Sequence, residues 1–356
     1  MLVADDDPEL LASTAMRARR HRHRWQLTTA LGGQAAIDRL TDEPFDLLIT
    51  DLSMPRVGGG QVLSAAKELR PSMVRFVLSG RADRSMAKDG STAHQVFAKP
   101  SDLDELLKRA DLALDARRLL SPEEVALVTS GAIVPPSPKI FAALHAALNL
   151  ADYEPRFVAK IVEQDMRLTT RLLQLASSSG LGPRRKVSSV RSAVVALGHD
   201  AIEQLVLLEE VMTPTKAVTA SNLRDHSFLV GGIAAALEPR IADCFVAGVL
   251  HDVGHLLCSE QDEPGGRHPL LGSYLAALWG FSALVVEAIR DHHAVHTASE
   301  PTLPSVLAFA DRVAFLGAAA FDDGATRRLG LDTAERWRRA SERFFEKQQA
   351  IAARVS

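Results

Sequence analysis

DLLITDLSMPRVGG, residues 46–59, is the most informative segment in the first third of the chain. It joins a short apolar run to Asp51 and then to a loop that contains Pro and Gly. A short apolar run bounded by turn residues is typical of a buried strand in a parallel sheet. Similar runs, separated by amphipathic stretches, predict strands over Leu2–Ala4, Asp46–Thr50, Val74–Ser79 and Gln95–Ala98. Strands that alternate with helical patterns predict a doubly wound α/β domain.

Polar side chains follow these predicted strands, at the edge of a parallel sheet where loops converge on one crevice. They are Asp5, Asp6, Asp51, Ser79 and Lys99. Three carboxylates held together repel one another and demand a hard divalent cation with oxygen ligands, most simply Mg²⁺. A carboxylate can then attack a phosphoryl donor while the metal and the lysine neutralise the phosphoryl oxygens. The hydroxyl of Ser79 would add a hydrogen bond to the phosphoryl group.

Four blocks that contain these residues resemble the receiver domain family of two-component response regulators. The blocks are VADDDP (3–8), DLLITDLSMPRVGG (46–59), VLSG (77–80) and KP (99–100). The resemblance covers the whole first domain and implies a flavodoxin-like fold with a five-stranded parallel sheet. It also implies that Asp51 is phosphorylated by a cognate sensor histidine kinase.

The same resemblance implies a magnesium site around the acceptor. Asp6, Asp51 and the carbonyl of Ser53 would bind Mg²⁺ directly, and Asp5 would assist through water.

The phosphoryl-sensing groups that the family implies are Ser79 and Lys99, and here the chain departs from the family pattern. The family usually has an aromatic residue three positions before the lysine, whereas this chain has Val96 there and Phe97 next to it. Coupling of Ser79 to an aromatic side chain therefore requires a one-residue shift of the strand.

Beyond Leu103 the pattern turns helical and stays helical, because no later stretch alternates with period two for long enough to form a sheet. The last segment is rich in Arg, Glu and Ala and predicts a terminal helix packed on one face. We expect a receiver domain over 1–118, a linker over 119–137, an all-α domain over 138–331 and a C-terminal helical extension over 332–356.

The composition, 47% hydrophobic and 24% charged, is ordinary for a globular protein, and a net charge of −3 gives no sign of a nucleic-acid partner. No segment approaches the roughly 20 apolar residues of a membrane span, and no signal sequence is apparent, so we expect a cytoplasmic protein. Cys244 and Cys258 have no second pair to complete a zinc site and are expected to be buried thiols. The basic run 17–24 is either a solvated helix end or a surface for an anionic partner.

The helical part concentrates histidines and aspartates that could meet at one place. Imidazoles and carboxylates from several helices can bind one or two transition metals, which lower the pKa of a bridging water for phosphoester hydrolysis. The residues are His226, His251, Asp252, His268, His292, His293 and Asp311.

Two blocks around these residues, AGVLHDVGH (247–255) and AIRDHH (288–293), resemble the HD superfamily. Residues 165–175 and 182–198 resemble its HDOD branch, the HD-related output domain. The HDOD branch is regarded as a non-enzymatic signalling output, whereas relatives with an HD-GYP signature hydrolyse cyclic di-GMP. The order of the histidines and aspartates is that of the HD metal ligands, so a vestigial metal site is also implied, with Fe or Mn as the metal.

Three departures from the hydrolases weaken an enzymatic interpretation. The chain has Ala294-Val295-His296-Thr297 in place of the Gly-Tyr-Pro segment, His255 in place of a lysine, and Asn222 where some hydrolases have a glutamate ligand. An imidazole is mostly uncharged at neutral pH and holds a phosphate less well than an ammonium group.

Two hypotheses remain for the whole chain. In the first, phosphorylation of Asp51 changes the contacts between the receiver and a non-catalytic HDOD domain, which binds or releases a partner protein. In the second, phosphorylation gates a metal-dependent phosphodiesterase that acts on cyclic di-GMP or another nucleotide. The missing Gly-Tyr-Pro segment favours the first. Direct DNA binding is not expected, because no short basic helix-turn-helix follows the receiver, and a homodimer through an exposed receiver face stays open.

Overall fold

The computed structural model describes both parts of the chain, with gaps. The described residues are 1–79, 93–99, 101–129, 144, 147, 154–163, 166–177, 189–198, 202, 220–241, 243–257, 266–294, 301–321 and 330–352.

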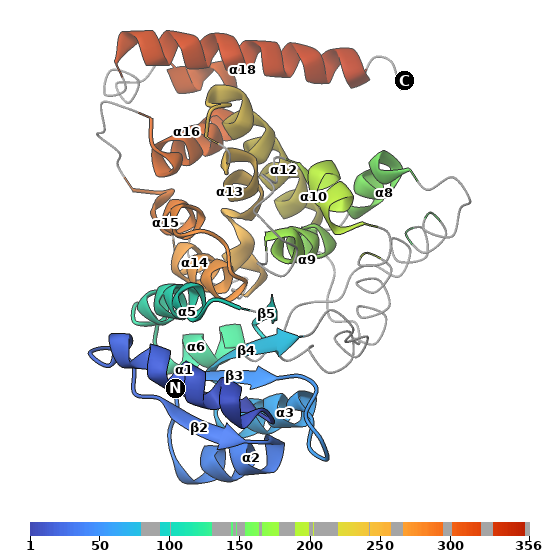
Figure 1. The fold of residues 1–356 in the computed structure, drawn as a ribbon. Coiled ribbons are helices and arrows are strands. Elements are labelled where there is room, and N and C mark those ends of the chain that lie inside the picture. Colours follow the sequence, from blue (N-terminus) through green and yellow to red (C-terminus); the bar gives the residue numbers. More distant parts are fainter. Residues whose placement is uncertain are drawn as a thin grey trace.

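A five-stranded parallel sheet forms the centre of the first part (Figure 1). Its order is β2 (Thr28–Leu31), β1 (Leu2–Asp5), β3 (Leu47–Asp51), β4 (Val74–Ser79) and β5 (Gln95–Ala98). The predicted doubly wound α/β fold is confirmed, and the four predicted strands agree with the structure to within one residue. The sequence pattern does not reveal β2, because only one of its four residues is buried and no apolar run marks it.

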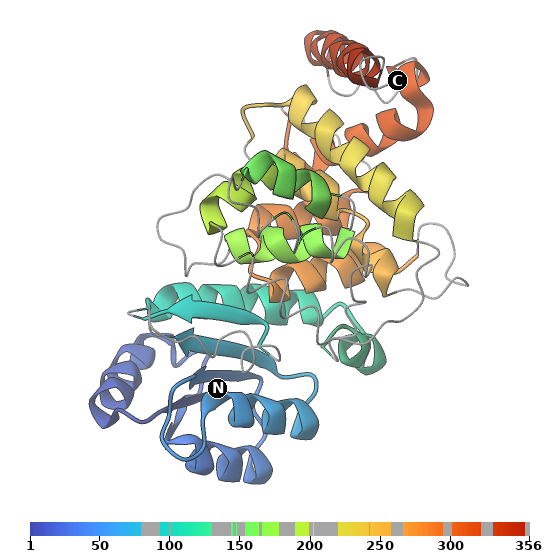
Figure 2. The ribbon, with the colours of Figure 1, turned by 90° about the vertical axis from the view of Figure 1, so that its right-hand side faces the viewer.

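Helices cover both faces of this sheet (Figures 1 and 2). Helices α1 (Pro8–Ala18) and α5 (Leu103–Arg117) bury apolar side chains against one face, and α2 (Gly33–Asp42) and α3 (Gly59–Leu69) against the other. Successive strand residues point to opposite faces, so each strand serves both layers. The first face contributes Val3, Ile49, Phe76 and Leu78, and the second contributes Leu2, Ala4, Leu48 and Val77.

The described elements beyond α5 are all helical, as the sequence predicts. They are α6 (Pro122–Thr129), α8 (Pro155–Val162), α9 (Met166–Ser177), α10 (Val190–Leu197), α12 (Ala220–Leu237), α13 (Cys244–Leu250), the 3₁₀ helix η3 (Val253–Leu256), α14 (His268–Leu278), α15 (Ala283–Asp291), α16 (Leu303–Leu316), the 3₁₀ helix η4 (Gly317–Phe321) and α18 (Leu331–Ala352).

The two parts share one hydrophobic core. The buried side chains of α1, α5 and the sheet face beneath them form a continuous cluster with those of the helical part. Helix α14 packs directly on α5, as both views of the ribbon show (Figures 1 and 2). The contact between receiver and helical part is therefore built into the core of the chain.

The expected linker over 119–137 contains helix α6, which packs against α14. The carbonyl of Thr129 at the end of α6 accepts a hydrogen bond from Arg75 of β4 at 3.2 Å. Residues 130–137 lie outside the described residues. The terminal helix α18 is packed on one face, as predicted, with Trp337 fully buried.

One helical stretch, Leu303–Phe321, is long and apolar enough to cross a membrane by length and composition, with 19 residues and a mean hydropathy of 1.4. The sequence prediction that no segment approaches a membrane span was therefore wrong for this stretch. In the fold its α16 portion packs against α12 and α15, with Val306, Leu307 and Ala310 fully buried. These contacts are those of a core helix.

Candidate functional site

Two clusters of titratable side chains stand out among the described residues, and the first lies at the carboxyl ends of β1 and β3. Asp5 and Asp51 are the last residues of these strands and are buried, whereas Asp6 is exposed. One carboxylate oxygen from each of the three lies within 4.8 Å of the others. The ammonium of Lys99 lies 2.8 Å from Asp5 Oδ2 and 3.0 Å from Asp51 Oδ2. The structure thus brings together four of the five side chains predicted to meet at this edge.

We call Asp5, Asp6, Asp51 and Lys99 the acidic pocket. Its electrostatics favour a divalent cation. Burial raises the pKa of Asp51, and the hydrogen bond from Lys99 offsets only part of that effect. Burial lowers the pKa of Lys99, but its bonds to Asp5 and Asp51 outweigh this and the pKa is raised. One ammonium among three carboxylates leaves an excess of negative charge, which a hard cation with oxygen ligands would neutralise.

The hydrogen bonds of Asp5 suggest how the carboxylates would share such a cation. Asp5 Oδ1 accepts from the backbone N–H of Asp7 at 2.9 Å, and Oδ2 pairs with Lys99. Both oxygens of Asp5 are therefore engaged, and the exposed carboxylate of Asp6 is better placed to contact a metal directly. Ser53 lies two residues beyond Asp51, in a loop whose residue Leu52 donates its N–H to the carbonyl of Leu78 at 3.0 Å.

A glycine makes room beside the acceptor strand. A Cβ on Gly59 would lie 2.1 Å from the backbone oxygen of Asp51, so helix α3 can begin here only with glycine. This explains one of the two glycines at the end of the segment 46–59.

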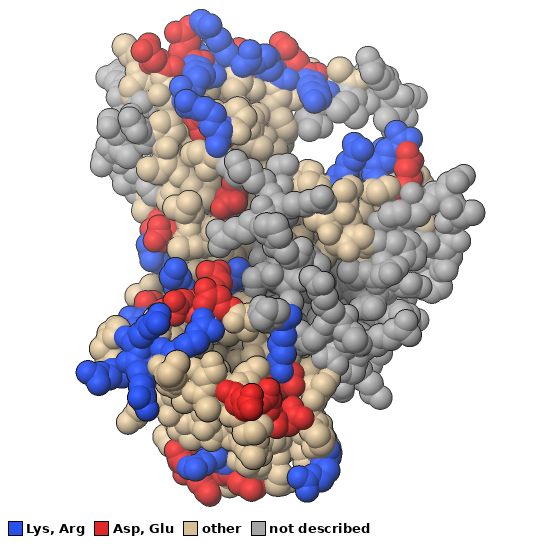
Figure 3. Space-filling model, in the orientation of Figure 1, with Lys and Arg blue, Asp and Glu red and all other residues tan. Residues whose placement is uncertain are grey.

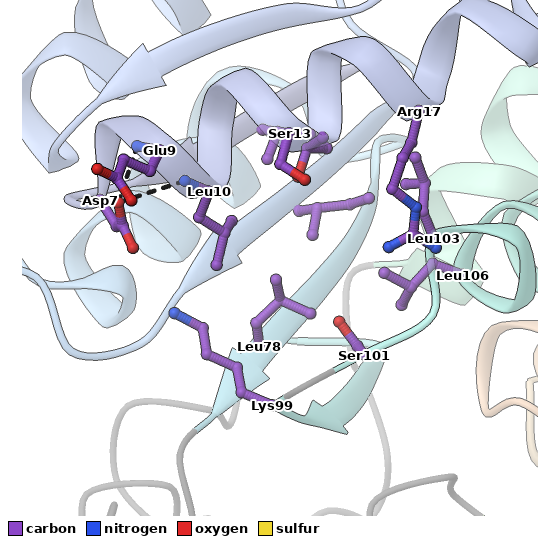
Figure 4. A pocket seen from close by; sticks show the side chains of 13 residues that line it. Asp7, Glu9, Leu10, Ser13, Arg17, Leu78, Lys99, Ser101, Leu103 and Leu106 are labelled. Atoms are coloured by element: carbon purple, nitrogen blue, oxygen red, sulfur yellow. Dashed lines mark hydrogen bonds between the residues drawn. The ribbon is translucent and has the colours of Figure 1, made fainter.

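A cavity of about 610 Å³ opens beside this pocket, under α1 (Figure 4). Its floor is apolar and includes Ile49, Leu78 and Leu106, and Lys99 lines one end. Arg17 lies at the other end, where it pairs with Asp102 at 2.7 Å. The ammonium of Lys99 is thus reached both from the cavity and from the acidic pocket.

The predicted phosphoryl-sensing residues are only partly described. Ser79 ends β4, but its side chain and that of Val96 lie outside the described residues, as do Gly80 and Pro100. In the sheet Ser79 is paired with Ala98 and Leu78 with Phe97.

Phe97 instead points into the shared core. It is buried, its ring centroid lies 5.2 Å from that of Phe76, and the guanidinium carbon of Arg109 lies 5.6 Å from its ring.

Residues of the basic run 17–24 form ion pairs with acidic residues on and next to α5. The run covers the end of α1 and the 3₁₀ helix η1 (Arg19–His21). His21 lies 2.8 Å from Asp104, and Arg24 pairs with Asp111 and Asp115. Figure 3 shows basic and acidic groups gathered side by side over α1 and α5.

The second cluster lies in the helical part and unites all seven predicted histidines and aspartates. His226 comes from α12, and His251 and Asp252 follow α13. His268 begins α14, His292 and His293 follow α15, and Asp311 lies on α16. We call these seven residues the His/Asp cluster.

The two aspartates of the His/Asp cluster lie among the imidazoles. His226 Nε2 is 3.0 Å from Asp311 Oδ1 and 3.7 Å from Asp252 Oδ2. On the other side, Asp252 Oδ1 lies 3.3 Å from His268 Nε2 and 3.5 Å from His292 Nε2. His293 Nε2 lies 3.2 Å from His268 Nε2.

The orientation of two buried imidazoles fits metal ligands. His251 Nδ1 donates to the carbonyl of Gly248 at 2.8 Å, and His292 Nδ1 donates to that of Ile289 at 2.6 Å. The Nε2 atoms of both rings are buried, lie near Asp252 and have no hydrogen-bond partner among the described residues. A backbone carbonyl that holds Nδ1 and leaves Nε2 facing a pocket is the usual arrangement around a bound transition metal.

The charges of the His/Asp cluster also demand a cation. Burial opposes ionisation of Asp252 and Asp311, but neighbouring histidines outweigh it and the pKa of each carboxyl is lowered. Burial would also lower the pKa of His251, but Asp252 and Asp311 raise it to about 10. The paired carboxylates must therefore be neutralised by a proton on His251 or by a metal ion.

His255, which stands where the hydrolases have a lysine, is exposed to solvent. Its ring stacks on His268 with centroids 3.9 Å apart, and burial together with the charge of His268 lowers its pKa. It is therefore neutral at pH 7 and is no substitute for an ammonium. The side chain of Asn222 and residues 295–297 lie outside the described residues.

Sequence reasoning missed the residues that hold His268 in place. A Cβ on Gly254 would lie 2.0 Å from the backbone oxygen of His268, so only glycine allows η3 to approach α14 this closely. Arg267, just before His268, forms an ion pair with Glu124 of α6. The glycine in HDVGH was a usable signal, whereas nothing local points to Glu124.

Cys244 is buried, as predicted, and burial raises the pKa of its thiol to about 12. Cys258 lies outside the described residues.

Comparison with known families supports both parts. Residues 1–111 match the family model of the response regulator receiver domain, residues 134–264 that of the HDOD domain and residues 223–316 that of the HD domain. The last two models overlap, so the HDOD match extends into the HD match.

Individual relatives cover parts of the chain. The response regulator receiver protein CpdR of Brucella abortus is 29% identical over 121 residues, which are 33% of this chain and 97% of that protein. An uncharacterized protein of Treponema pallidum is 23% identical over 214 residues, which are 50% of this chain and only 41% of that protein. The solved structure of the MmoQ response regulator from Methylococcus capsulatus is 20% identical, with a TM-score of 0.45, over 57% of this chain and 97% of that chain.

Proposed function

Because this chain is a response regulator in which a receiver domain is followed by an HDOD and HD region, we propose that it accepts a phosphoryl group on Asp51 and relays this change to the helical part. A receiver implies a phosphodonor, and a sensor histidine kinase is the proposed donor. The observation that carries the proposal is the position of Asp51 at the end of β3, beside Asp5, Asp6 and Lys99.

The proposed transfer follows from this geometry. A carboxylate oxygen of Asp51 attacks the phosphorus of a phosphohistidine, and the phosphorus–nitrogen bond of the donor breaks. The ammonium of Lys99 moves from the carboxylates to an oxygen of the new phosphoryl group and neutralises it. Asp6, Asp51 and the Ser53 carbonyl would hold Mg²⁺, which shields the charge of the incoming phosphoryl group. The hydroxyl of Ser79 is the proposed donor to a further phosphoryl oxygen.

The test is incorporation of phosphate from acetyl phosphate, followed by intact-protein mass spectrometry. We expect wild type to gain one phosphoryl group and Asp51→Asn to gain none. Asp46→Asn is the matched control, because Asp46 is an exposed carboxylate directly before the same strand and pairs with Arg117. Undiminished incorporation by Asp51→Asn would refute the assignment.

For the helical part we propose a phosphorylation-controlled signalling module that binds a partner protein. The HDOD match supports this role, and so does the large packed contact between α5 and α14, through which a change in the receiver can reach the helical part.

A second candidate, a phosphorylation-gated phosphodiesterase, is favoured by one observation, the complete His/Asp cluster. Two buried Nε2 atoms face its carboxylates, and an iron or manganese ion held there would activate a water for attack on a phosphodiester. Elemental analysis of the purified full-length protein, followed by cyclic di-GMP turnover with and without beryllofluoride, separates the candidates. Stoichiometric metal with turnover would establish the hydrolase, and metal without turnover would leave the signalling module.

A further inference from the structure

Helix α14 joins the receiver to the His/Asp cluster. Its first residue, His268, is 3% exposed and lies against Asp252 and His293, while the rest of the helix runs along α5 (Figures 1 and 2). The eleven residues of α14 thus have a candidate metal ligand at one end and the receiver along their length.

The receiver holds the carboxyl end of α14. Gln95 of β5 donates its side-chain N–H to the carbonyl of Ala277 at 3.1 Å, and Arg109 of α5 donates to that of Gly280 at 3.0 Å. These carbonyls belong to the last turn and the residues just after it, where a helix has no internal partners and favours a cation. Arg109 is only 8% exposed, so the contact is sealed from water.

The segment after α5 holds the amino end. Arg267 donates from Nε and Nη2 to the two carboxylate oxygens of Glu124, each at 2.6 Å, and from Nη2 to the carbonyl of Leu119 at 3.0 Å. An isolated ion pair near the surface contributes little, but a bidentate guanidinium–carboxylate pair fixes direction as well as distance. Arg267 is adjacent to His268, so this pair fixes the backbone that carries the imidazole.

We propose that Arg267 and Glu124 are positioning residues that set the place of His268 in the His/Asp cluster, and that α14 thereby makes the cluster responsive to the receiver. The inference rests on the proposed metal-binding role of the cluster. Both ends of α14 are bound to α5, β5 and α6. A displacement of α5 relative to the helical part must therefore change the hydrogen bonds and ion pair that hold α14. His268 is the cluster residue that such a displacement would move first.

A double-mutant cycle on the full-length protein tests the positioning role, with Co²⁺ as the probe. Excess Mg²⁺ keeps the oxygen-rich acidic pocket filled, and the visible absorption of Co²⁺ bound by imidazoles reports the His/Asp cluster. We expect Glu124→Gln to weaken Co²⁺ binding about tenfold, as loss of a supporting group does. In a His268→Ala background the same substitution should have no further effect.

The matched control is Glu123→Gln, because Glu123 is the neighbouring exposed carboxylate on α6 and, among the described residues, bonds only locally, to Ser121. An equal loss from Glu124→Gln in both backgrounds would mean a merely structural role and overturn the proposal. No loss in either background would overturn it as well.

A second measurement separates this inference from the metal site on which it rests. Amide hydrogen exchange of residues 267–272, followed without metal, should be faster in Glu124→Gln than in wild type and unchanged in Glu123→Gln. If wild type bound no Co²⁺, the metal site would fail, and exchange would still decide whether Glu124 anchors His268. Unchanged exchange in Glu124→Gln would refute the anchor even if Co²⁺ bound well.

Discussion

The acidic pocket of the receiver and the His/Asp cluster both contain buried carboxylates, but the two sites neutralise these charges in different ways. In the pocket, Lys99 already lies within 3.0 Å of two buried carboxylates and supplies part of the counter-charge. In the cluster the partners of Asp252 and Asp311 are imidazoles, which neutralise a carboxylate only when they are protonated or when they share a metal with it. The receiver site can therefore stand without a metal, whereas the cluster depends on a proton or a metal ion.

The two sites differ in their construction as well. The pocket is assembled at the carboxyl ends of β1, β3 and β5 of one sheet, so its geometry follows from the fold of a single domain. The cluster is assembled from α12, α14, α15, α16 and the turn after α13, and α14 is also bound to the receiver. Its geometry therefore depends on the contact between the two parts of the chain.

The largest effect that should separate the two sites is that of Asp252→Asn. Removing this carboxylate should weaken Co²⁺ binding more than about 100-fold, beyond the loss expected from a supporting group. Phosphate incorporation at Asp51 should be unchanged. Absorption titration and mass spectrometry give the two readouts, and Asp291→Asn, next to the cluster on α15, is the control. Full Co²⁺ affinity in Asp252→Asn would show that the cluster does not bind metal through its central carboxylate.

A pair of glycine substitutions should damage each site separately. Gly254→Ala would force η3 away from His268 and should lower Co²⁺ affinity about 10- to 100-fold. Gly59→Ala would press on Asp51 and should cost about 1–3 kcal/mol of stability and slow phosphorylation. Gly58→Ala is the control, since its Cβ would meet nothing closer than 3.5 Å. If Gly254→Ala bound Co²⁺ like wild type, the close approach would have no role in shaping the cluster.

Metal removal should distinguish the sites by their stability. A ligand present at 100 times its dissociation constant stabilises the folded state by about 2.7 kcal/mol, so chelation should lower the unfolding temperature of the helical part by a few degrees. Returning Mg²⁺ alone should not restore it, whereas Mn²⁺ should. Calorimetry makes the measurement, and His251→Ala should abolish the effect of Mn²⁺. An unchanged unfolding temperature after chelation of metal-loaded protein would contradict a tightly bound metal.

The sequence predicts the pocket better than the cluster, for a physical reason. Apolar runs mark strands locally, and parallel strands bring Asp5, Asp51 and Lys99 to one edge whatever the rest of the chain does. The edge strand β2 cannot be predicted in this way, because Ala30 is its only buried residue and the strand contains no apolar run.

In the helical part the order of the histidines predicts that they meet but not how they are held. The bond from Gln95 to Ala277 joins residues 182 positions apart, and the pair of Arg267 with Glu124 spans 143 positions. The local spacing of apolar residues cannot predict such contacts, because they depend on how the receiver packs against the helical part. The same holds for the stacking of His255 on His268. The family comparison says only that the hydrolases have a lysine at this position, and it does not predict the stacking.

The smallest effect should come from charges that belong to neither site. Arg24 pairs with Asp111 and Asp115, but its side chain is 38% exposed, so solvent and salt screen the attraction. Arg24→Gln should therefore lower the free energy of unfolding by less than about 1 kcal/mol. Urea unfolding at low and high salt measures it, with Arg22→Gln as the control, since this exposed arginine of the same run forms no ion pair with the described residues. The difference should shrink in high salt, and a salt-independent loss above about 2 kcal/mol would mean that the α1–α5 pairs are as structurally important as the buried pair of Lys99 with Asp5.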